Sequence, residues 1–331
     1  MADDNRLNED FLVKSGQYAD TMESVVLPWL RERQRDARVK GAEGRELFCS
    51  FYAADAPRGT VVVVHGFTEN AFKYSELIFS LVHAGFNVCA WDQRGHGRSW
   101  RDERISDLSL THVQDFNEYV EDMERVRDAM LRDSPKPWSV LCHSMGGAVT
   151  GLYLERHPGV FARAVLCSPM IAANRGGVPF FLTKAMCRSM KLVGRGRQRI
   201  FLSKPYAGPE DFATSAATGR ERFDWYDAVK AATPEYANNG PTYDWTLQSM
   251  RVSQMLLWPG RVEKIDAQVR LYSAALDTTV LPSAQRMFAK RLRHGRIITV
   301  EGAKHEIFRS PDDVVFPWWH GVLAFLKCEE D

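Results

Sequence analysis

The chain has 331 residues, of which 45% are hydrophobic and 26% charged, so it is long enough to bury a sizeable core. This composition excludes intrinsic disorder, collagen-like repeats and a coiled-coil rod. Lys and Arg number 43 against 42 Asp and Glu, and the net charge of +1 gives no support for nucleic-acid binding, which usually brings a strong basic excess.

Targeting signals and cysteine spacing indicate the cellular compartment in which the protein is expected. No apolar run reaches the roughly 18 residues that a membrane-spanning helix needs, and the acidic, polar N-terminus does not resemble a secretory signal. The six cysteines form no CxxC pair and no zinc-spaced cluster with histidine. We therefore expect a cytoplasmic protein with buried, reduced cysteines and no metal site.

The predicted elements begin with a polar helical lead-in over the first 40 or so residues, including a helix over 27–36. An alternating stretch at 46–54 predicts a half-buried strand, and the continuous β-branched run at 60–67 predicts a strand covered on both faces. Helix and strand then alternate: helices at 74–84, 115–131 and 145–157, strands at 86–92, 138–144 and 161–169. Such alternation with short loops is typical of βαβ units on a parallel sheet.

The alternation stops near residue 170 and resumes near 266, and the residues between form helical and turn-rich patches without a clear buried strand. A strand at 269–276, a helix at 282–292, a strand at 296–302 and a closing helix at 316–328 follow. We therefore expect an α/β core made of residues 1–170 and 266–331, with residues 171–265 inserted as a helical cap or lid.

The most informative segment is WSVLCHSMGGAVTGLYL, where a buried strand ends at Ser144 and a helix begins at once. This is the context of a nucleophile elbow, in which a strained serine projects above the sheet edge. Strand and helix pass so closely there that positions two before and two after the serine must be small. Gly146 satisfies this, and Cys142 replaces the usual glycine of G-x-S-x-G with another small residue.

A serine hydroxyl needs a base, and the base needs an orienting acid. Asp277 follows the strand at 269–276 and His305 follows the strand at 296–302, so both lie on the same rim as Ser144. Asp266 and Glu263 are alternative acids, but they precede their strand. His143 is next to the serine and is expected to point away from it. The order Ser144, Asp277, His305 therefore predicts a catalytic triad.

Acyl transfer also needs donors for the developing oxyanion, usually backbone N–H groups. We expect them from Met145, directly after the nucleophile, and from Phe67, after the turn at His65 and Gly66. The glycine-rich loop DQRGHGRS (92–99) lacks the features of a phosphate-binding loop, and we interpret it as a structural corner beside the site.

With these residues assembled, the chain resembles the α/β-hydrolase superfamily, and within it the bacterial lysophospholipases and monoglyceride lipases of the serine aminopeptidase-like group. The resemblance spans nearly the whole chain. It is carried by HGFTEN (65–70), WDQRGHGRS (91–99), CHSMGGA (142–148), HPGVFARAVLCSPM (157–170), NGPTYDW (239–245) and GAKHEIF (302–308). It implies an α/β-hydrolase fold, a serine esterase or lipase acting without a cofactor, and the same triad and oxyanion donors.

The segment 171–209 holds eight basic residues and no acidic one, interleaved with apolar residues. Positions 178, 182, 186, 190 and 193 share one helical face, which suits an anionic lipid surface or a phosphate headgroup. The alternative is that this face packs on the core and the basic residues are solvated. The basic residues are Arg175, Lys184, Arg188, Lys191, Arg195, Arg197, Arg199 and Lys204.

We therefore predict a lipid ester substrate, most simply a lysophospholipid or monoacylglycerol, with a membrane surface as a second contact and no nucleic-acid partner. Two alternatives remain open. An exopeptidase or amidase would use the same triad but needs an acidic pocket for a substrate amino terminus. A catalytically silent binding protein would keep the fold without the chemistry.

Overall fold

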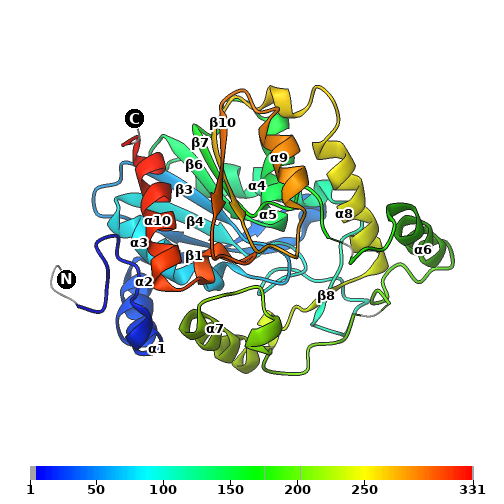
Figure 1. Ribbon diagram of the computed structural model, residues 1–331, viewed down its shortest axis with the longest axis horizontal. Coiled ribbons are helices and arrows are strands. Elements are labelled where there is room, and N and C mark those ends of the chain that lie inside the picture. The colour runs from blue at the N-terminus through cyan, green and yellow to red at the C-terminus, as the bar shows by residue number, and fades with distance from the viewer. Residues whose placement is uncertain (1–4, 175, 202, 330–331) are drawn as a thin grey trace.

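The computed structural model describes residues 5–174, 176–201 and 203–329, and its centre is one eight-stranded sheet (Figure 1). The strand order is β1-β2-β4-β3-β6-β7-β9-β10. β2 runs antiparallel to both of its neighbours, and every other pair is parallel. The strands are β1 (Gln34–Lys40), β2 (Glu46–Tyr52), β3 (Gly59–Val64), β4 (Phe86–Trp91), β6 (Trp138–His143), β7 (Arg163–Cys167), β9 (Gln268–Ala274) and β10 (Gly295–Val300).

Helices cover both faces of this sheet, which confirms the predicted fold class. One face packs against α4 (Asn117–Met130), α5 (Met145–Arg156) and α9 (Pro282–Ala289). The other packs against α2 (Leu27–Arg33), α3 (Ser75–His83) and α10 (Asp312–Lys327), with the short α1 (Tyr18–Thr21) beside it. Val62 and Val64 of β3 enter the first core and Val61 and Val63 the second, so the continuous apolar run reflects burial on both sides.

The N-terminal prediction was wrong over 34–40. The helix ends at Arg33 instead of continuing to residue 36, and the chain turns into β1, which pairs with β2. β1 is the outermost strand and buries only Val39. An edge strand of this kind carries polar and charged residues in place of an apolar pattern, so its sequence gives little sign of a strand.

Residues between β7 and β9 form the helices α6 (Phe180–Leu192), α7 (Arg220–Ala232) and α8 (Tyr243–Leu256). Within the described part of this segment no strand joins the main sheet. The two-residue β8 (Gly240–Pro241) pairs instead with β5 (Leu110–Thr111). Figure 1 shows α6 at the periphery, with α8 between it and the sheet. Arg175 lies outside the described residues.

Two further expectations can be compared with the structure. All six cysteines are free, and five are buried, while Cys328 at the end of α10 is exposed. Among the helices that the structure describes, none combines the length and apolarity needed to cross a bilayer.

Candidate active site

Ser144 lies at the turn between β6 and α5, in the strained conformation that the sequence predicts. Its φ is 50° and its ψ is −115°, a region that residues other than glycine rarely adopt. The Ser144 amide donates to the carbonyl oxygen of Cys167 (3.1 Å), which ties the turn to the neighbouring strand. A Cβ on Gly146 would lie 2.2 Å from the carbonyl oxygen of Val64, so this position requires glycine.

Cys142 is accommodated at the elbow, in the position where the usual motif has glycine. Its side chain is fully buried, and its thiol donates to the carbonyl oxygen of Val165 at 3.4 Å. Burial raises the pKa of the Cys142 thiol to about 12, so the thiol stays protonated and unreactive. Cys142 therefore replaces the usual glycine as a small buried side chain that packs at the elbow.

The loops after β9 and β10 bring Asp277 and His305 to Ser144. His305 Nε2 lies 2.9 Å from Ser144 Oγ, and His305 Nδ1 lies 2.8 Å from Asp277 Oδ2. The other carboxylate oxygen of Asp277 accepts the amides of Thr279 (2.8 Å) and Val280 (3.1 Å). The three side chains form one continuous hydrogen-bonded chain, in the order that the sequence predicts.

The electrostatics of Asp277 match an acid that stays ionised. Burial alone would raise the pKa of Asp277, but the hydrogen bond and charge of His305, with the Thr279 and Val280 amides, lower it below its ordinary value. A carboxylate held in this state fixes a proton on His305 Nδ1 and leaves Nε2 free to accept one from Ser144.

The two expected oxyanion donors lie beside the serine. Among the described residues, no acceptor contacts the amide of Phe67 or the amide of Met145. Met145 is the first residue of α5, where amides lack helical partners. A Cβ on Gly66 would lie 3.1 Å from the Cβ of Ser144, so the turn that carries Phe67 is in direct contact with the elbow.

A buried ionic network behind the site was missed by the sequence analysis. Glu69 Oε2 accepts the Gly66 amide (2.6 Å) and the Tyr74 hydroxyl (2.6 Å) and lies 3.1 Å from His143 Nδ1. Its Oε1 accepts from Lys73 Nζ (2.9 Å). The available signal was a Glu with a Lys four residues later, immediately after the turn at Gly66 and Phe67, but such a pair usually lies on the solvent-exposed face of a helix.

The same network reaches the loop that carries His305. Lys73 Nζ also donates to Glu306 Oε1 (2.6 Å), and His143 Nε2 lies 3.2 Å from the carbonyl oxygen of His305. His143 therefore points away from Ser144, as the structure of a strand requires of the neighbouring residue. One group of buried charges thus joins the turn at Gly66, the end of β6 at His143 and the loop that carries His305.

Lys73 holds two carboxylates in their charged forms. Burial would raise the pKa of Glu69, but Lys73 and His143 outweigh burial and lower it well below the ordinary value. Burial likewise opposes Lys73 and Arg309 at Glu306, whose pKa falls to about 2. Because the folded pKa values are depressed, this stabilisation is full above about pH 4.5 and is lost as the pH falls toward 2.

We predict that Lys73→Met lowers the free energy of unfolding at pH 7 by about 3–5 kcal/mol, because two buried carboxylates lose their cation. The deficit against wild type should shrink as the pH falls from 7 to 4, because burial without the cation raises the pKa of both carboxylates and they take up protons in the variant. Urea unfolding at pH 7 and pH 4 measures both values. Lys290→Met, at an exposed position of the chain, is the control and should cost little. An equal deficit at the two pH values would contradict the ionic explanation.

The loop 92–99 is hydrogen-bonded to residues 65–68, the turn that carries Phe67, consistent with the structural corner expected from the sequence. His65 Nε2 accepts the Gln93 amide (2.8 Å), and His96 Nε2 accepts the Thr68 amide (3.3 Å). Burial lowers the pKa of both histidines, so each ring is neutral and has a nitrogen that accepts. Asp92 accepts the amides of Ala71 and Arg98, each at 2.8 Å.

An apolar cavity of about 520 Å³ lies between α6 and α8. Its lining includes Phe180, Met186, Met250 and Trp245, and the Trp245 ring lies 4.0 Å from the ring of Phe67. Residues 173 and 174 also line it, and they pair with residues 279 and 280, whose amides hold the acid. Residues that line the cavity therefore contact the turn that carries Phe67 and the loop that follows Asp277, although Ser144, Asp277 and His305 do not line it.

A second, charged pocket of about 160 Å³ adjoins the site from the side of α7. Thr68 and Glu306, the neighbours of Phe67 and His305, line it together with Asp227 and Lys230 of α7. Lys230 Nζ pairs with Glu210 Oε1 (2.5 Å), and Asp227 Oδ1 accepts the Glu210 amide (3.0 Å). The site thus has an apolar side and a side that carries charges of both signs.

The sheet order, the helices on both faces and the strained serine at a strand–helix turn define this chain as an α/β-hydrolase. Solved structures agree on the fold: a monoglyceride lipase from Saccharomyces cerevisiae matches 90% of this chain and 97% of its own with a TM-score of 0.70 at 18% identity. A monoacylglycerol lipase from Paleococcus ferrophilus matches 86% of this chain and all of its own with a TM-score of 0.68 at 22% identity.

The sequence pattern of the family described as serine aminopeptidase, S33 matches residues 55–312, and the chain belongs to this family. Lysophospholipase L2 of Escherichia coli is 31% identical over 309 residues, which cover 89% of this chain and 88% of that protein. Monoglyceride lipase of Homo sapiens is 36% identical over 135 residues, 40% of this chain and 42% of that protein. These similarities confirm the resemblance found in the sequence.

Proposed function

We propose that this protein hydrolyses carboxylic esters of lipids, as a lysophospholipase or monoacylglycerol lipase, through an acyl-enzyme on Ser144. The observation that carries the proposal is the hydrogen-bonded chain Ser144–His305–Asp277 at the elbow, next to a 520 Å³ apolar cavity. Relatives named lysophospholipase and monoglyceride lipase support the ester class over an amide or peptide substrate.

The first half of the reaction forms the acyl-enzyme. His305 Nε2 takes the proton of Ser144 Oγ, and the oxygen attacks the ester carbonyl carbon. The amides of Phe67 and Met145 donate to the oxyanion that develops. As the carbonyl re-forms, the bond to the alcohol breaks, and His305 gives its proton to the departing alcohol oxygen.

The second half repeats these steps with water. His305 removes a proton from a water molecule, the hydroxide attacks the acyl carbon, and Ser144 leaves with the proton to release the fatty acid. Asp277 keeps the imidazole in one tautomer and stabilises its charge in both halves. The scheme uses only groups of this chain and needs no cofactor.

The two sides of the site favour a lysophospholipid over a neutral glyceride. The apolar cavity suits an acyl chain, because chain burial is the main source of affinity for a lipid. The charged pocket beside Thr68 and Glu306 suits a headgroup that carries its own charges. Lys230 is already paired with Glu210, so the group left for a cationic headgroup is the Asp227 carboxylate, whose Oδ1 accepts the Glu210 amide.

The test is a substrate panel of lysophospholipids, monoacylglycerols, p-nitrophenyl esters and aminoacyl amides, measured on wild type and on Ser144→Ala. We expect the lipid esters to be cleaved fastest, the amides slowly, and every activity to disappear in the variant. Faster cleavage of the amides would favour the exopeptidase alternative. Absence of labelling by a fluorophosphonate probe, which reacts with activated serines, would favour the silent binding protein.

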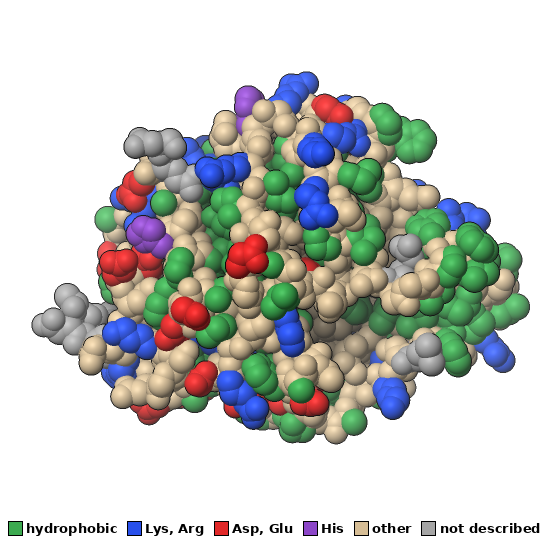
Figure 2. All heavy atoms as spheres, in the orientation of Figure 1, with side chains coloured by type: hydrophobic (Ala, Val, Ile, Leu, Met, Phe, Trp, Pro, Cys, Tyr) green, Lys and Arg blue, Asp and Glu red, His purple; other side chains and the backbone are tan. Residues whose placement is uncertain are grey.

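We further propose that residues 171–265 form the cap of the site and that α6 contacts a lipid surface, in a cytoplasmic protein held at the inner face of the membrane. The inward side of α6 is Thr183 and Cys187, so the apolar face expected from the sequence does not pack on the core. Leu182 and Val193 of that face are 51% and 67% exposed, and Phe181 (67%) and Leu192 (86%) are exposed beside them. Figure 2 shows this apolar patch at the end of the molecule, with basic side chains around it.

For this surface we predict that Phe181→Ser with Leu192→Ser lowers binding to vesicles of anionic phospholipid by about tenfold or more, because two large apolar side chains no longer enter the bilayer interface. Lys184→Glu with Arg188→Glu should weaken activity on lysophospholipid far more than on a short neutral ester. Vesicle co-sedimentation and parallel rate assays measure these effects.

Equal losses on the lipid and the short ester would count against a lipid contact. Met287→Ser, exposed on α9, is the matched apolar control.

A further inference from the structure

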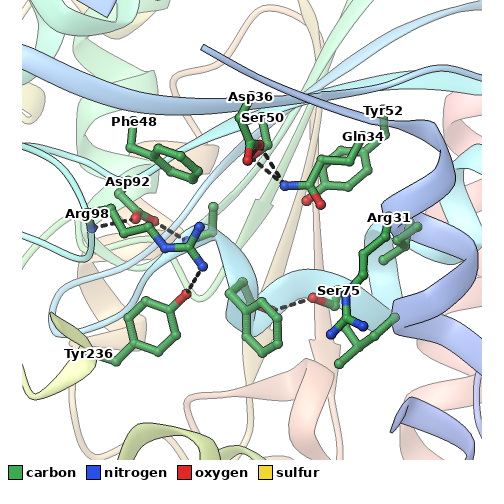
Figure 3. Close-up of a pocket in the computed structure, with 14 residues that line it drawn as sticks. Arg31, Gln34, Asp36, Phe48, Ser50, Tyr52, Ser75, Asp92, Arg98 and Tyr236 are labelled. Carbon is green, nitrogen blue, oxygen red and sulfur yellow. Dashed lines mark hydrogen bonds between the residues drawn. The ribbon is translucent and has the colours of Figure 1, made fainter. Parts of the chain in front are cut away.

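A cavity of about 350 Å³ lies outside the site described above, between α2, the strands β1 and β2, and the short 3₁₀ helix Ala71–Tyr74 that precedes α3 (Figure 3). None of the triad residues or oxyanion residues lines it. Its volume is within the usual range of small-molecule sites, about 300–1,000 Å³. Nothing in the hydrolytic scheme uses it.

Two guanidinium groups lie on opposite sides of this cavity, Arg31 from α2 and Arg98 from the 92–99 loop (Figure 3). Within residues 5–174, 176–201 and 203–329, Arg31 has no hydrogen bond or ion pair. The Arg98 side chain donates to the Tyr236 hydroxyl (3.2 Å) and lies over the Phe48 ring, 4.8 Å from its centroid. Among the described residues neither guanidinium forms an ion pair with a carboxylate, although Asp92 and Asp36 lie close enough to Arg98 for their charges to favour its ionised form.

Three of the four carboxylate oxygens in the cavity already accept hydrogen bonds, and among the described residues Asp36 Oδ2 is the exception. Asp92 accepts backbone amides on both of its oxygens. Asp36 accepts the Ser50 hydroxyl (2.7 Å) and the Gln34 side-chain amide (2.6 Å), both on Oδ1 (Figure 3). Each guanidinium offers five N–H donors, so the cavity holds many more donors than acceptors. Its chemistry therefore calls for a ligand rich in acceptor oxygens.

The rest of the lining is aromatic and apolar. The ring of Phe72 stacks with the ring of Tyr236 at 5.9 Å and an interplanar angle of 27°, and Leu27 and Leu30 of α2 complete the wall. Tyr236 is 4% exposed and comes from the segment between β7 and β9, whereas Phe72 and Arg98 come from the core. A molecule in this cavity would contact both parts of the chain.

We propose that this cavity is a second ligand site, which takes a small organic anion with an apolar or aromatic body. Its phosphate or carboxylate group lies between Arg31 and Arg98, where planar guanidinium groups bind such oxygens with charge-assisted hydrogen bonds. Its body lies against Phe72 and Tyr236. Since neither arginine takes part in the proposed hydrolysis, binding here is independent of Ser144.

The test is calorimetric titration of the full chain with phenyl phosphate, benzoate and inorganic phosphate. We expect one phenyl phosphate per chain in wild type and in Ser144→Ala, and weaker binding of inorganic phosphate, which has no body to pack. Arg31→Gln and Arg98→Gln should each weaken phenyl phosphate binding by about tenfold or more, and added salt should weaken it as well. Comparing benzoate with phenyl phosphate decides which acid group fits.

The matched control is Arg35→Gln. Arg35 lies on β1 between Gln34 and Asp36, so its exposed side chain points to the opposite face of the strand. Binding should be unchanged in this variant. The proposal is overturned if none of the three probes binds, if both arginine variants bind as wild type does, or if Ser144→Ala abolishes binding. Inorganic phosphate binding as tightly as phenyl phosphate would overturn the role of the apolar wall.

Discussion

Ser144→Ala is expected to lower kcat on a monoacyl lipid ester by about 10⁴- to 10⁶-fold, with little change in stability. The variant loses only the nucleophilic oxygen, while the oxyanion amides, the cavity and the ion network remain. Residual rate then comes from water held in the same site. Single-turnover assays and loss of fluorophosphonate labelling measure the effect.

Ser168→Ala is a stringent control for this result. Ser168 follows β7, the strand next to β6, and it also has a positive φ, 41°. Its hydroxyl is buried, and no partner for it exists in the described part of the chain. Ser168 thus shares with Ser144 a strained backbone and a buried side chain. It differs in that its hydroxyl does not contact His305. Normal activity in Ser144→Ala, or loss of labelling in Ser168→Ala alone, would contradict the assignment of the nucleophile.

Asp277→Asn is expected to lower kcat at neutral pH by about 10⁴-fold with a small change in KM. An asparagine amide donates to His305 Nδ1, which places the imidazole proton on Nε2. That proton then faces Ser144 Oγ, and His305 no longer accepts the serine proton. Steady-state kinetics on a p-nitrophenyl ester measure both parameters.

The same variant makes a prediction about stability. The pKa of Asp277 is depressed in the folded protein, so its carboxylate stabilises the fold above its ordinary pKa of 3.8 and this contribution is lost as the pH falls below that value. The difference in unfolding free energy between wild type and Asp277→Asn should therefore be present at pH 7 and shrink below about pH 3.8.

Asp266→Asn tests the alternative acid. Asp266 precedes β9, and its Oδ1 accepts the Gly159 amide (3.0 Å), far along the strand from the rim that carries His305. We expect normal turnover in this variant. A large loss in Asp266→Asn together with an active Asp277→Asn would reverse the assignment that strand order gives.

Most of the sheet was predictable because burial on both faces leaves a continuous apolar run, as in β3. Turn residues then mark where each strand ends. The strand β1 was not predicted because it lies at the edge of the sheet and buries only Val39, so its sequence has no apolar run. On α6, the sequence predicted one apolar face but left open whether it packs on the core. Only the packing on α8 decided that Thr183 and Cys187 face inward while Phe181 and Leu192 stay exposed.

The sequence by itself determined the α/β core, the elbow at Ser144 and the chain order of the serine, acid and histidine, because these depend on local periodicity and on which strand each residue follows. Only the tertiary structure decided how Lys73 pairs with Glu306, 233 residues away, and how two arginines come to face one cavity. Such pairings depend on how distant loops meet after the sheet has formed. The sequence alone does not distinguish charged side chains that are buried in this way from charged side chains that are exposed to solvent.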